Sequence, residues 1–397
     1  MSDLERYRTD HLILLVGGNP LPNYVAARVL GKKGGTLHLV HSQKSYKIAQ
    51  RLDKCFRAPA EGNHLAGGFG SIEFIQVGED EPSDIYNKVH ELAQRLGSSV
   101  GLNYTSGNRP MSVHAYEAVK DACAKAQFSY LDAGRLEMLV FDARRVSHRF
   151  RADPLLSMRL ETLLQLQGLE ASSIAPSDTP VQPGLAASLA ELHSTPEGEK
   201  AWFEWRRTGS DGWKKLPKGQ PRLKGVEAAL EQLCGGDPTP DCVAQALGYT
   251  DLSSSTEWWK SKWLEHYVFA ELQEAIKGRE DTHDAWMGVK RKRQDFENRD
   301  FELDVVVMRR YQLFVFSCIV SHQAQACKDH LMEAYVRARQ AGGDEARVGL
   351  VCTSDQPEAL QREIVGDLDA GGKIRVFGRG DLLSLADRIR DWLDQQP

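Results

Sequence analysis

The sequence has few cysteines, no long apolar run and no strong excess of charge of either sign. Its seven cysteines are odd in number and include no CxxC pair, so we expect reduced thiols and no structural zinc site. The apolar run at residues 12–16 is too short for a signal peptide or a membrane span, and no later stretch approaches about 18 apolar residues. Fifty basic residues against fifty-five acidic ones give a net charge of −5, which is not typical of a nucleic-acid coat protein but leaves room for local basic patches. We therefore expect a soluble, cytoplasmic protein without a membrane partner.

The length of 397 residues is enough for two or three domains. Residues 1–142 alternate between apolar strands and amphipathic helices, which is typical of βαβ units and a mostly parallel sheet. We expect a Rossmann-like domain here, closed by a hairpin. Its predicted strands are residues 11–17, 36–40, 71–77, 100–103, 128–131 and 137–142, and its predicted helices are 45–52, 82–96 and 111–126, besides one through Val25, Val29 and Leu30.

The rest of the chain divides into a helical linker and a second α/β domain. Residues 143–254 are rich in Pro, Ser and Gly, and they include two short predicted helices at 226–233 and 242–247. That pair is interpreted either as a DNA-reading helix-turn-helix or, more economically, as a connector that relays movement. From residue 255 to 397 the predicted order is helix, three strands, helix and strand, followed by a further helix, strand and helix.

Two turns stand where strands of the first domain end, which is where ligands bind to parallel sheets. Glycines allow a ligand close to the backbone, and free amides at a helix start favour phosphate. The alternative is that these are ordinary tight turns. The pattern is not GxGxxG and no acid ends the second strand, which disfavours NAD. The candidate ligand residues are Gly17, Gly18, Asn19, Pro20, Leu21 and Pro22, then His41, Ser42 and Gln43, and finally Asn103, Thr105, Ser106, Gly107, Asn108, Arg109, Pro110 and Met111.

The segments VGGNPLPN and LNYTSGNRPMSVHAY resemble the CRISPR-associated Rossmann-fold (CARF) domain, over residues 8–142. That family carries a similar Asn-Tyr-Thr-Gly-Gly-Thr-Lys-Pro-Met turn, from which Ser106, Asn108 and Arg109 depart conservatively. The resemblance implies a homodimer that binds a cyclic oligoadenylate, most often the tetramer and otherwise the hexamer, across its two-fold axis. A ring with even symmetry and one phosphate per nucleotide suits two copies of the same turn.

Three acids of the last domain are predicted to converge. Glu265 lies on an otherwise apolar helix, and Glu302 and Asp304 lie on one face of a strand. Carboxylates brought together repel each other unless a divalent cation lies between them. We expect a hard divalent cation, Mn²⁺ or Mg²⁺, among these acids, where it can activate water against a phosphodiester. The alternative for Glu265 is a simple ion pair with Lys262 or a nearby arginine.

The helix-Glu, hairpin, Glu-x-Asp order resembles the PD-(D/E)XK nuclease domain of CARF-linked CRISPR ancillary nucleases, over residues 255–397. The resemblance implies that Glu265 and Asp304 are catalytic or metal-binding acids, with Glu302 adjacent. Such nucleases usually carry a lysine at the end of the third strand, where this chain has Ser317-Cys318-Ile319. Lys328 on the next helix is the predicted substitute, with Lys290 and Lys292 as weaker candidates. Otherwise the domain is a weakened or inactive nuclease.

A basic run, Lys290-Arg291-Lys292-Arg293, precedes the acidic strand. It is either a solvated hairpin or a contact for a nucleic-acid backbone without sequence reading. We expect a nuclease of type III CRISPR defence, activated by a cyclic oligoadenylate, that cuts DNA or RNA. Two alternatives stay open. One is a non-catalytic sensor or regulator, and the other is a ring nuclease in which Thr105 or Ser106 positions a ribose hydroxyl of the messenger.

Overall fold

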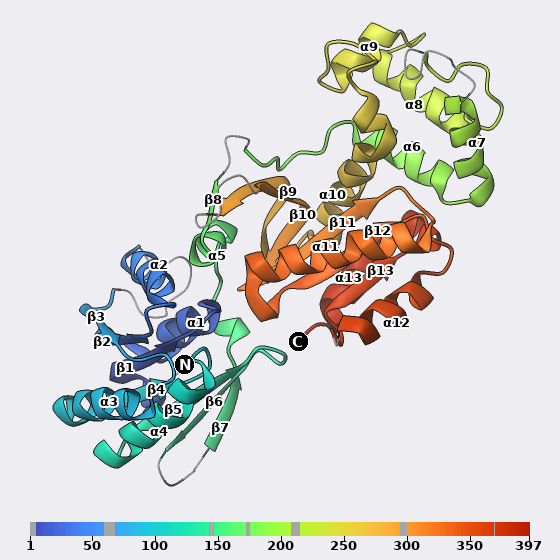
Figure 1. The fold of residues 1–397 in the computed structure, drawn as a ribbon. Coiled ribbons are helices and arrows are strands. Elements are labelled where there is room, and N and C mark those ends of the chain that lie inside the picture. The colour runs from blue at the N-terminus through green and yellow to red at the C-terminus, as the bar shows by residue number, and fades with distance from the viewer. Residues whose placement is uncertain are drawn as a thin grey trace.

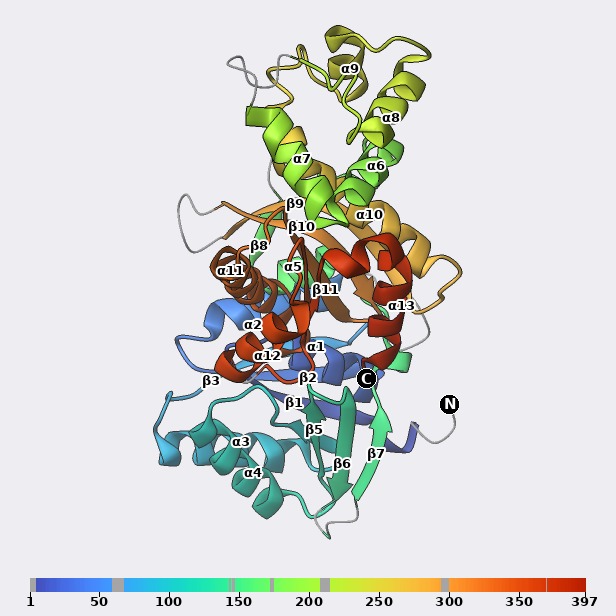
Figure 2. The same cartoon turned by 90° about the vertical axis from the view of Figure 1, so that its right-hand side faces the viewer.

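The computed structural model describes residues 5–58, 68–142, 144, 147–171, 175–207, 215–293, 300–368 and 370–397. Two β-sheets with helices on both faces form its body (Figure 1), and a lobe of short helices projects beyond the second sheet (Figure 2). Among the described residues, no helix combines the length and the apolar composition needed to cross a bilayer.

The N-terminal sheet has seven strands in the order β3-β2-β1-β4-β5-β6-β7. The strands from β3 to β5 in that order run parallel, whereas β6 and β7 are antiparallel to their neighbours. The predicted alternation of strands and helices is confirmed. The strands are β1 (Thr9–Val16), β2 (Gly31–His41), β3 (Ser71–Gln76), β4 (Val100–Asn103), β5 (Gln127–Asp132), β6 (Glu137–Asp142) and β7 (Ser147–Arg151).

Helices cover both faces of this sheet because its central strand is apolar on both sides. Leu12 and Leu14 of β1 belong to the core beneath α1 and α2, whereas Ile13 and Leu15 belong to the core beneath α3 and α4. This double burial is typical of parallel sheets. The helices are α1 (Leu21–Leu30), α2 (Tyr46–Arg57), α3 (Pro82–Leu96) and α4 (Arg109–Ala122).

The segment between the two sheets contributes a strand to each of them. β7 extends the N-terminal sheet, and β8 (Leu169–Ala171) forms an edge of the other. The sequence did not predict either strand. The remaining elements are helical: α5 (Leu160–Leu166) lies between the sheets, and the projecting lobe contains α6 (Pro183–His193), α7 (Pro196–Arg207), α8 (Lys224–Cys234) and α9 (Pro240–Ala246).

The expectation of reduced thiols is wrong for two of the seven cysteines. Cys234, the last residue of α8, is joined by a disulfide to Cys242 in α9. The turn between the two short helices brings these residues together, which the linear spacing without a CxxC pair did not reveal. The other five cysteines are buried thiols outside this disulfide.

The C-terminal sheet has the order β13-β12-β11-β10-β9-β8. Its strands are β9 (Thr282–Arg293), β10 (Asp300–Arg309), β11 (Gln312–Ile319), β12 (Arg347–Cys352) and β13 (Ile374–Phe377). α10 (Trp263–Ile276) and α13 (Leu385–Gln395) pack on one face through Phe314 and Phe316. α11 (Ala324–Gly342) and α12 (Pro357–Leu368) pack on the other face, in the same apolar core as α1 and α2 of the N-terminal domain. The predicted order of elements is confirmed.

Candidate functional site

The two predicted ligand turns meet at one edge of the N-terminal sheet. β1 and β4 are neighbours, with Leu14 opposite Asn103, so the turns that follow them lie side by side. Ser106 Oγ donates a hydrogen bond to the Asn19 carbonyl and accepts one from the Gly17 amide at 3.4 Å. A Cβ on Gly17 would lie 1.6 Å from the Ser106 carbonyl oxygen, so only glycine permits this approach. The two turns therefore form a single structure.

Hydrogen bonds inside the second turn fix its polar side chains. The Asn103 amide group donates to Ser129 Oγ at 3.0 Å and accepts from the Thr105 backbone amide at 3.3 Å. Thr105 Oγ1 accepts from the Leu131 amide at 2.8 Å. Since Ser106 holds the first turn, both hydroxyls that a ring nuclease would use are already engaged in shaping the site.

Asn108 and Arg109 define the start of α4. Asn108 Oδ1 accepts from the Met111 amide at 2.8 Å, and its Nδ2 donates to the Glu79 carbonyl at 2.8 Å. Arg109 is the exposed first residue of the helix, and the first turn contains no acid. The positive end of the helix dipole and the guanidinium thus lie together beside the joined turns, an arrangement that favours an anion.

The predicted ligand residues differ in how far solvent reaches them. Three are exposed: Gly18, Gln43 and Arg109. Seven are half-buried: Gly17, Asn19, Thr105, Ser106, Gly107, Asn108 and Pro110. Seven are buried beneath them and shape the turns: Pro20, Leu21, Pro22, His41, Ser42, Asn103 and Met111.

The predicted acids of the C-terminal domain converge around one lysine. Lys262 Nζ lies 2.9 Å from Glu265 Oε1 and 3.2 Å from Glu302 Oε1. Glu265 is on α10, one turn after Lys262, whereas Glu302 is on β10. The ion pair that the sequence offered as an alternative for Glu265 is thus present. We call Lys262, Glu265, Glu302 and Asp304 the acid cluster.

Asp304 is held from the neighbouring strand β11. Its Oδ2 accepts hydrogen bonds from the Cys318 backbone amide at 2.9 Å and from Ser317 Oγ at 3.2 Å. Cys318 lies between the acids and the core, and burial together with the charges of Asp304 and Glu265 raises the pKa of its thiol well above the usual range. The thiol stays neutral, and the carboxylate of Asp304 is fixed in orientation.

Burial dominates the electrostatics of the acid cluster. Burial first, and the charge of Asp304 second, raise the pKa of Glu265 to about 8, against the opposing effect of Lys262. Burial also raises the pKa of Asp304, although the Cys318 amide lowers it. Burial alone would lower the pKa of Lys262, but the charges of Glu265 and Glu302 outweigh it and raise that pKa. The lysine is therefore a permanent cation in this place.

The lysine that the sequence predicted as a substitute pairs with an acid outside the acid cluster. Ile319 ends β11 at the position where the resembling nucleases carry lysine. Lys328, on α11, forms an ion pair with Glu363 of α12. Lys290, on β9, is nearer, with its Nζ 3.5 Å from Glu302 Oε2.

The basic run on β9 divides between the two faces of the sheet. Lys290 is opposite Glu302 and faces the acid cluster. Arg291 is only 5% exposed and pairs with Glu161 of α5 at 2.8 Å. The run is therefore not one continuous basic surface. It ends at Lys292, which is exposed, and Arg293, whose backbone pairs with β8.

The donor set of the acid cluster suits a hard cation. Among the described residues, no group of three or more His, Cys, Asp or Glu side chains is arranged to hold a metal. Mg²⁺, however, is usually bound by one or two carboxylates with waters and substrate phosphates. Glu265 and Asp304 are two such carboxylates, and the repulsion that helps to raise the pKa of Glu265 is what a cation would relieve. The residues present therefore fit Mg²⁺ or Mn²⁺.

The ligand turn also contacts the C-terminal domain directly. Asn19 Nδ2 lies 3.5 Å from Oε2 of Glu345, in the turn between α11 and β12. Gly343 in that turn has a φ of +70°, and a Cβ there would lie 2.8 Å from Asn19 Nδ2. On the same helix, Arg337 donates to the Glu302 carbonyl at 3.2 Å. The turn after α11 thus touches the ligand turn, and Arg337 near the end of α11 touches the acid strand.

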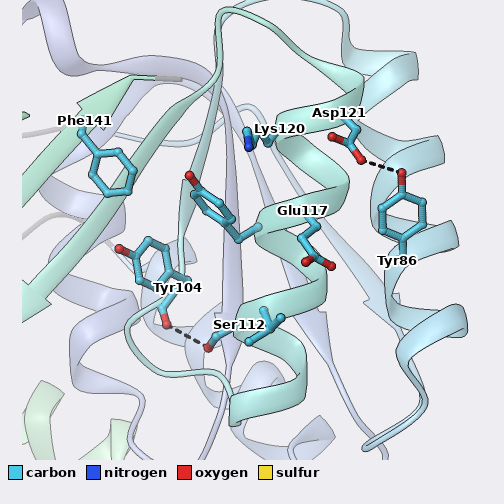
Figure 3. Close-up of a pocket in the computed structure, with 9 residues that line it drawn as sticks. Tyr86, Tyr104, Ser112, Glu117, Lys120, Asp121 and Phe141 are labelled. Atoms are coloured by element: carbon cyan, nitrogen blue, oxygen red, sulfur yellow. Dashed lines mark hydrogen bonds between the residues drawn. The ribbon is translucent and has the colours of Figure 1, made fainter. Parts of the chain in front are cut away.

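A pocket of about 670 Å³ opens on the α3–α4 side of the N-terminal sheet (Figure 3). Tyr104, from the second ligand turn, faces it, and Tyr86 donates to Asp121 Oδ2 at 2.9 Å across its rim. The other lining residues are Ser112, Val113, Tyr116, Glu117, Lys120 and Phe141. The sequence did not predict this pocket, because helical spacing on α4 indicates only an amphipathic face.

Comparison with known proteins shows the fold. No protein-family model matches the chain, and no curated protein does. Can2 from Sulfobacillus thermosulfidooxidans, solved in complex with cyclic tetra-adenylate, has a TM-score of 0.68 at 16% identity and covers 98% of each chain. Protein VC1899 from Vibrio cholerae has a TM-score of 0.67 at 16% identity, over 97% of this chain and 98% of that one. A type III CRISPR defence DNA nuclease activated by cyclic oligoadenylate has a TM-score of 0.47 at 19% identity, over 86% of this chain and 45% of that one. The chain has the α/β fold of Can2 and VC1899 throughout, which confirms the predicted α/β fold class.

Proposed function

We propose that the chain is a metal-dependent nuclease that a cyclic oligoadenylate, first of all cyclic tetra-adenylate, switches on. The observation that carries the proposal is the convergence of Glu265 from α10 with Glu302 and Asp304 from β10 around one cation. Buried acids next to one another are costly for folding, so a site built from them indicates chemistry rather than stability.

Glu265 and Asp304 would hold Mg²⁺ or Mn²⁺. When bound, the ion polarises a phosphodiester and makes an activated water available at neutral pH. The chain's own part is orientation: the Cys318 amide and Ser317 hydroxyl fix the Asp304 carboxylate. Lys290 and the exposed Lys292 offer charge to the nucleic-acid backbone beside the acids.

The joined turns of the N-terminal domain are the proposed ligand site. Gly18 and Arg109 are exposed there, next to the start of α4. A cyclic oligoadenylate carries one phosphate per nucleotide, and a two-fold pair of such turns, in a homodimer, matches a ring of four. The fold shared with Can2, which was solved with cyclic tetra-adenylate, supports this choice of ligand.

The contact between Asn19 and Glu345 supports gating of one site by the other. A ligand that moves the first ligand turn changes the contact between that turn and the turn that follows α11. Shifting such a two-state equilibrium from 1:99 to 99:1 requires about 5.5 kcal/mol of differential ligand affinity. A ring with several phosphates that contacts two protomers is able to supply this.

A cleavage assay tests the proposal. Purified protein is incubated with single- and double-stranded DNA and with RNA, with Mg²⁺ or Mn²⁺, and with cyclic tetra- or hexa-adenylate or neither. We expect cutting only with metal and ligand together. No cutting of any substrate with both metals and both rings would overturn the proposal.

Replacing Asp304 separates the two sites. The Asp304→Ala variant loses a proposed metal ligand, so we expect cutting to fall to background. Its affinity for labelled cyclic tetra-adenylate, measured by equilibrium binding, stays that of the wild type because Asp304 belongs to the other domain. A parallel loss of ligand affinity would contradict the two-site arrangement.

A non-catalytic sensor is the second candidate function. It is favoured by Ile319 at the position of the usual lysine and by the ammonium of Lys262 between two of the acids. Calorimetry with Mn²⁺ discriminates, since the sensor would bind ring but no metal at the acid cluster.

A further inference from the structure

Lys262 is the cation best placed to act on a phosphate at the acid cluster. Its Nζ lies within 3.2 Å of carboxylate oxygens on two different elements, α10 and β10. The next residue, Trp263, is fully buried, which fixes the backbone from which the lysine projects. Its side chain is nevertheless 38% exposed, so that solvent reaches part of it.

The other lysines are less suitable for this task. Lys328 is engaged by Glu363 of α12. Lys290 approaches only Glu302, at 3.5 Å. Lys260, on the same helical turn as Lys262, pairs instead with Glu257. Lys262 alone among these four contacts both Glu265 and Glu302.

Phosphodiester hydrolysis needs positive charge where negative charge develops. As water attacks phosphorus, charge accumulates on the non-bridging oxygens and on the leaving oxygen, and a preorganised cation lowers that barrier strongly. Because carboxylates already hold the lysine in a partly buried position, the site needs little reorganisation when the phosphate binds. The usual source of this charge is missing from β11, since Ile319 has no charge to offer.

We propose that Lys262 is a catalytic residue whose ammonium contacts the scissile phosphate, in place of the lysine absent from position 319. The assignment rests on the proposed nuclease function. In the reaction, the water oxygen bonds to phosphorus and one phosphorus–oxygen ester bond breaks. The proton lost by the water passes to solvent and the departing alkoxide takes one up, which leaves a phosphate monoester and a hydroxyl end. Lys262 remains protonated throughout and contributes charge and position.

Four single substitutions test the assignment: Lys262→Met, Lys260→Met, Lys290→Met and Lys328→Met. Single-turnover cleavage is measured with saturating ligand and Mn²⁺, together with Mn²⁺ binding by calorimetry and thermal melting. We expect Lys262→Met to slow cleavage by about 100-fold or more, the typical effect of removing one transition-state donor. We expect Lys260→Met, the matched control, and Lys328→Met to stay within about 2-fold of the wild type, whereas Lys290→Met weakens substrate binding more than rate.

Metal binding distinguishes a catalytic lysine from a mere counter-ion. Removing a positive charge next to Glu265 leaves Mn²⁺ affinity unchanged or higher, so a slower Lys262→Met enzyme that still binds Mn²⁺ supports the proposal. Partial recovery in Lys262→Arg supports it further. Should Lys262→Met melt early, Lys262→Gln, which still donates hydrogen bonds to the acids, replaces it.

Two results would overturn the role of Lys262 and leave the proposed nuclease function intact. One is a wild-type cleavage rate in a folded Lys262→Met variant, and the other is a 100-fold slower cleavage in Lys328→Met instead. A wild-type protein that cuts no substrate would instead overturn the proposed function, and the role of Lys262 with it. The two failures are thus distinguishable.

Discussion

Glu345 is a carboxyl group placed where solvent cannot reach it. Its residue is 0% exposed, and burial raises its pKa to about 7, with Asp344 adding to the effect. Only Oε2 has a hydrogen-bond partner, Asn19, whereas Oε1 has none. A buried acid with half of its oxygens unsatisfied destabilises the protein wherever it is ionised.

The pH dependence of this destabilisation has a definite sign. Between the ordinary value of 4.5 and about 7, the folded state holds a proton that the unfolded state has lost, so stability falls as pH rises through that window. Glu345→Gln removes the titration. We expect the Tm of Glu345→Gln minus the Tm of the wild type to be about 3 °C larger at about pH 8 than at about pH 5. This corresponds to at most about 3 kcal/mol of unfolding free energy. Differential scanning calorimetry at both pH values checks this, and a pH-independent difference would contradict it.

At the scale of residues, local spacing predicted some partners and missed others. Lys262 and Glu265 are three apart on a helix, and the sequence therefore offered their pairing. Glu345 and Asn19 are 326 residues apart, and no periodic pattern relates them. No local spacing relates Glu265 to Asp304, and it was the family resemblance that singled out these two acids as the metal-binding pair.

At the scale of elements, apolar sequence patterns predicted the strands that are buried in the core. β1 and β11 are buried almost throughout, and β1 was predicted within a few residues and β11 by its place in the order of elements. β7 was missed because four of its five residues are exposed and only backbone pairing to β6 defines it. β8 has three residues, too few for any alternation to show.

The joined ligand turns give a prediction at this scale. Gly17→Ala places a methyl group against the Ser106 carbonyl, whereas Gly18→Ala meets nothing within 4 Å. We expect Gly17→Ala to lower the free energy of unfolding by about 1–3 kcal/mol, the usual cost of overpacking, and to abolish binding of cyclic tetra-adenylate.

Gly18→Ala is the matched control and keeps the stability of the wild type. Urea unfolding and equilibrium ligand binding measure both effects. Equal stability of the two variants would show that the turns are not held together as the structure has them.

At the scale of the whole molecule, α11 connects the two sites. Its 19 residues span about 28 Å at 1.5 Å per residue, across the face of the C-terminal sheet that looks toward the N-terminal domain (Figure 1). Gly343 abuts Asn19 beyond one end, and Arg337 holds the Glu302 carbonyl closer to the middle. The end of α11 and the turn that follows it together touch both sites and are a physical route for coupling.

Coupling of this kind is reciprocal: if the ring favours substrate binding, substrate must favour the ring by the same factor. We therefore expect DNA or RNA, whichever is cut, to tighten binding of cyclic tetra-adenylate to the wild type by about 5-fold or more. Asp304→Ala protein allows this measurement without cleavage.

Gly343→Ala in the same background tests the route. The added Cβ would lie within 3.0 Å of Asn19 and Glu345 at a φ of +70°, so the two turns must move apart. We expect substrate to lose its effect on ring affinity while the affinity for the ring alone changes little. Gly366→Ala, on α12 with nothing within 4 Å of its Cβ, is the control and keeps the coupling. Unchanged coupling in Gly343→Ala would mean that the signal bypasses the end of α11, for instance through the partner protomer of a dimer.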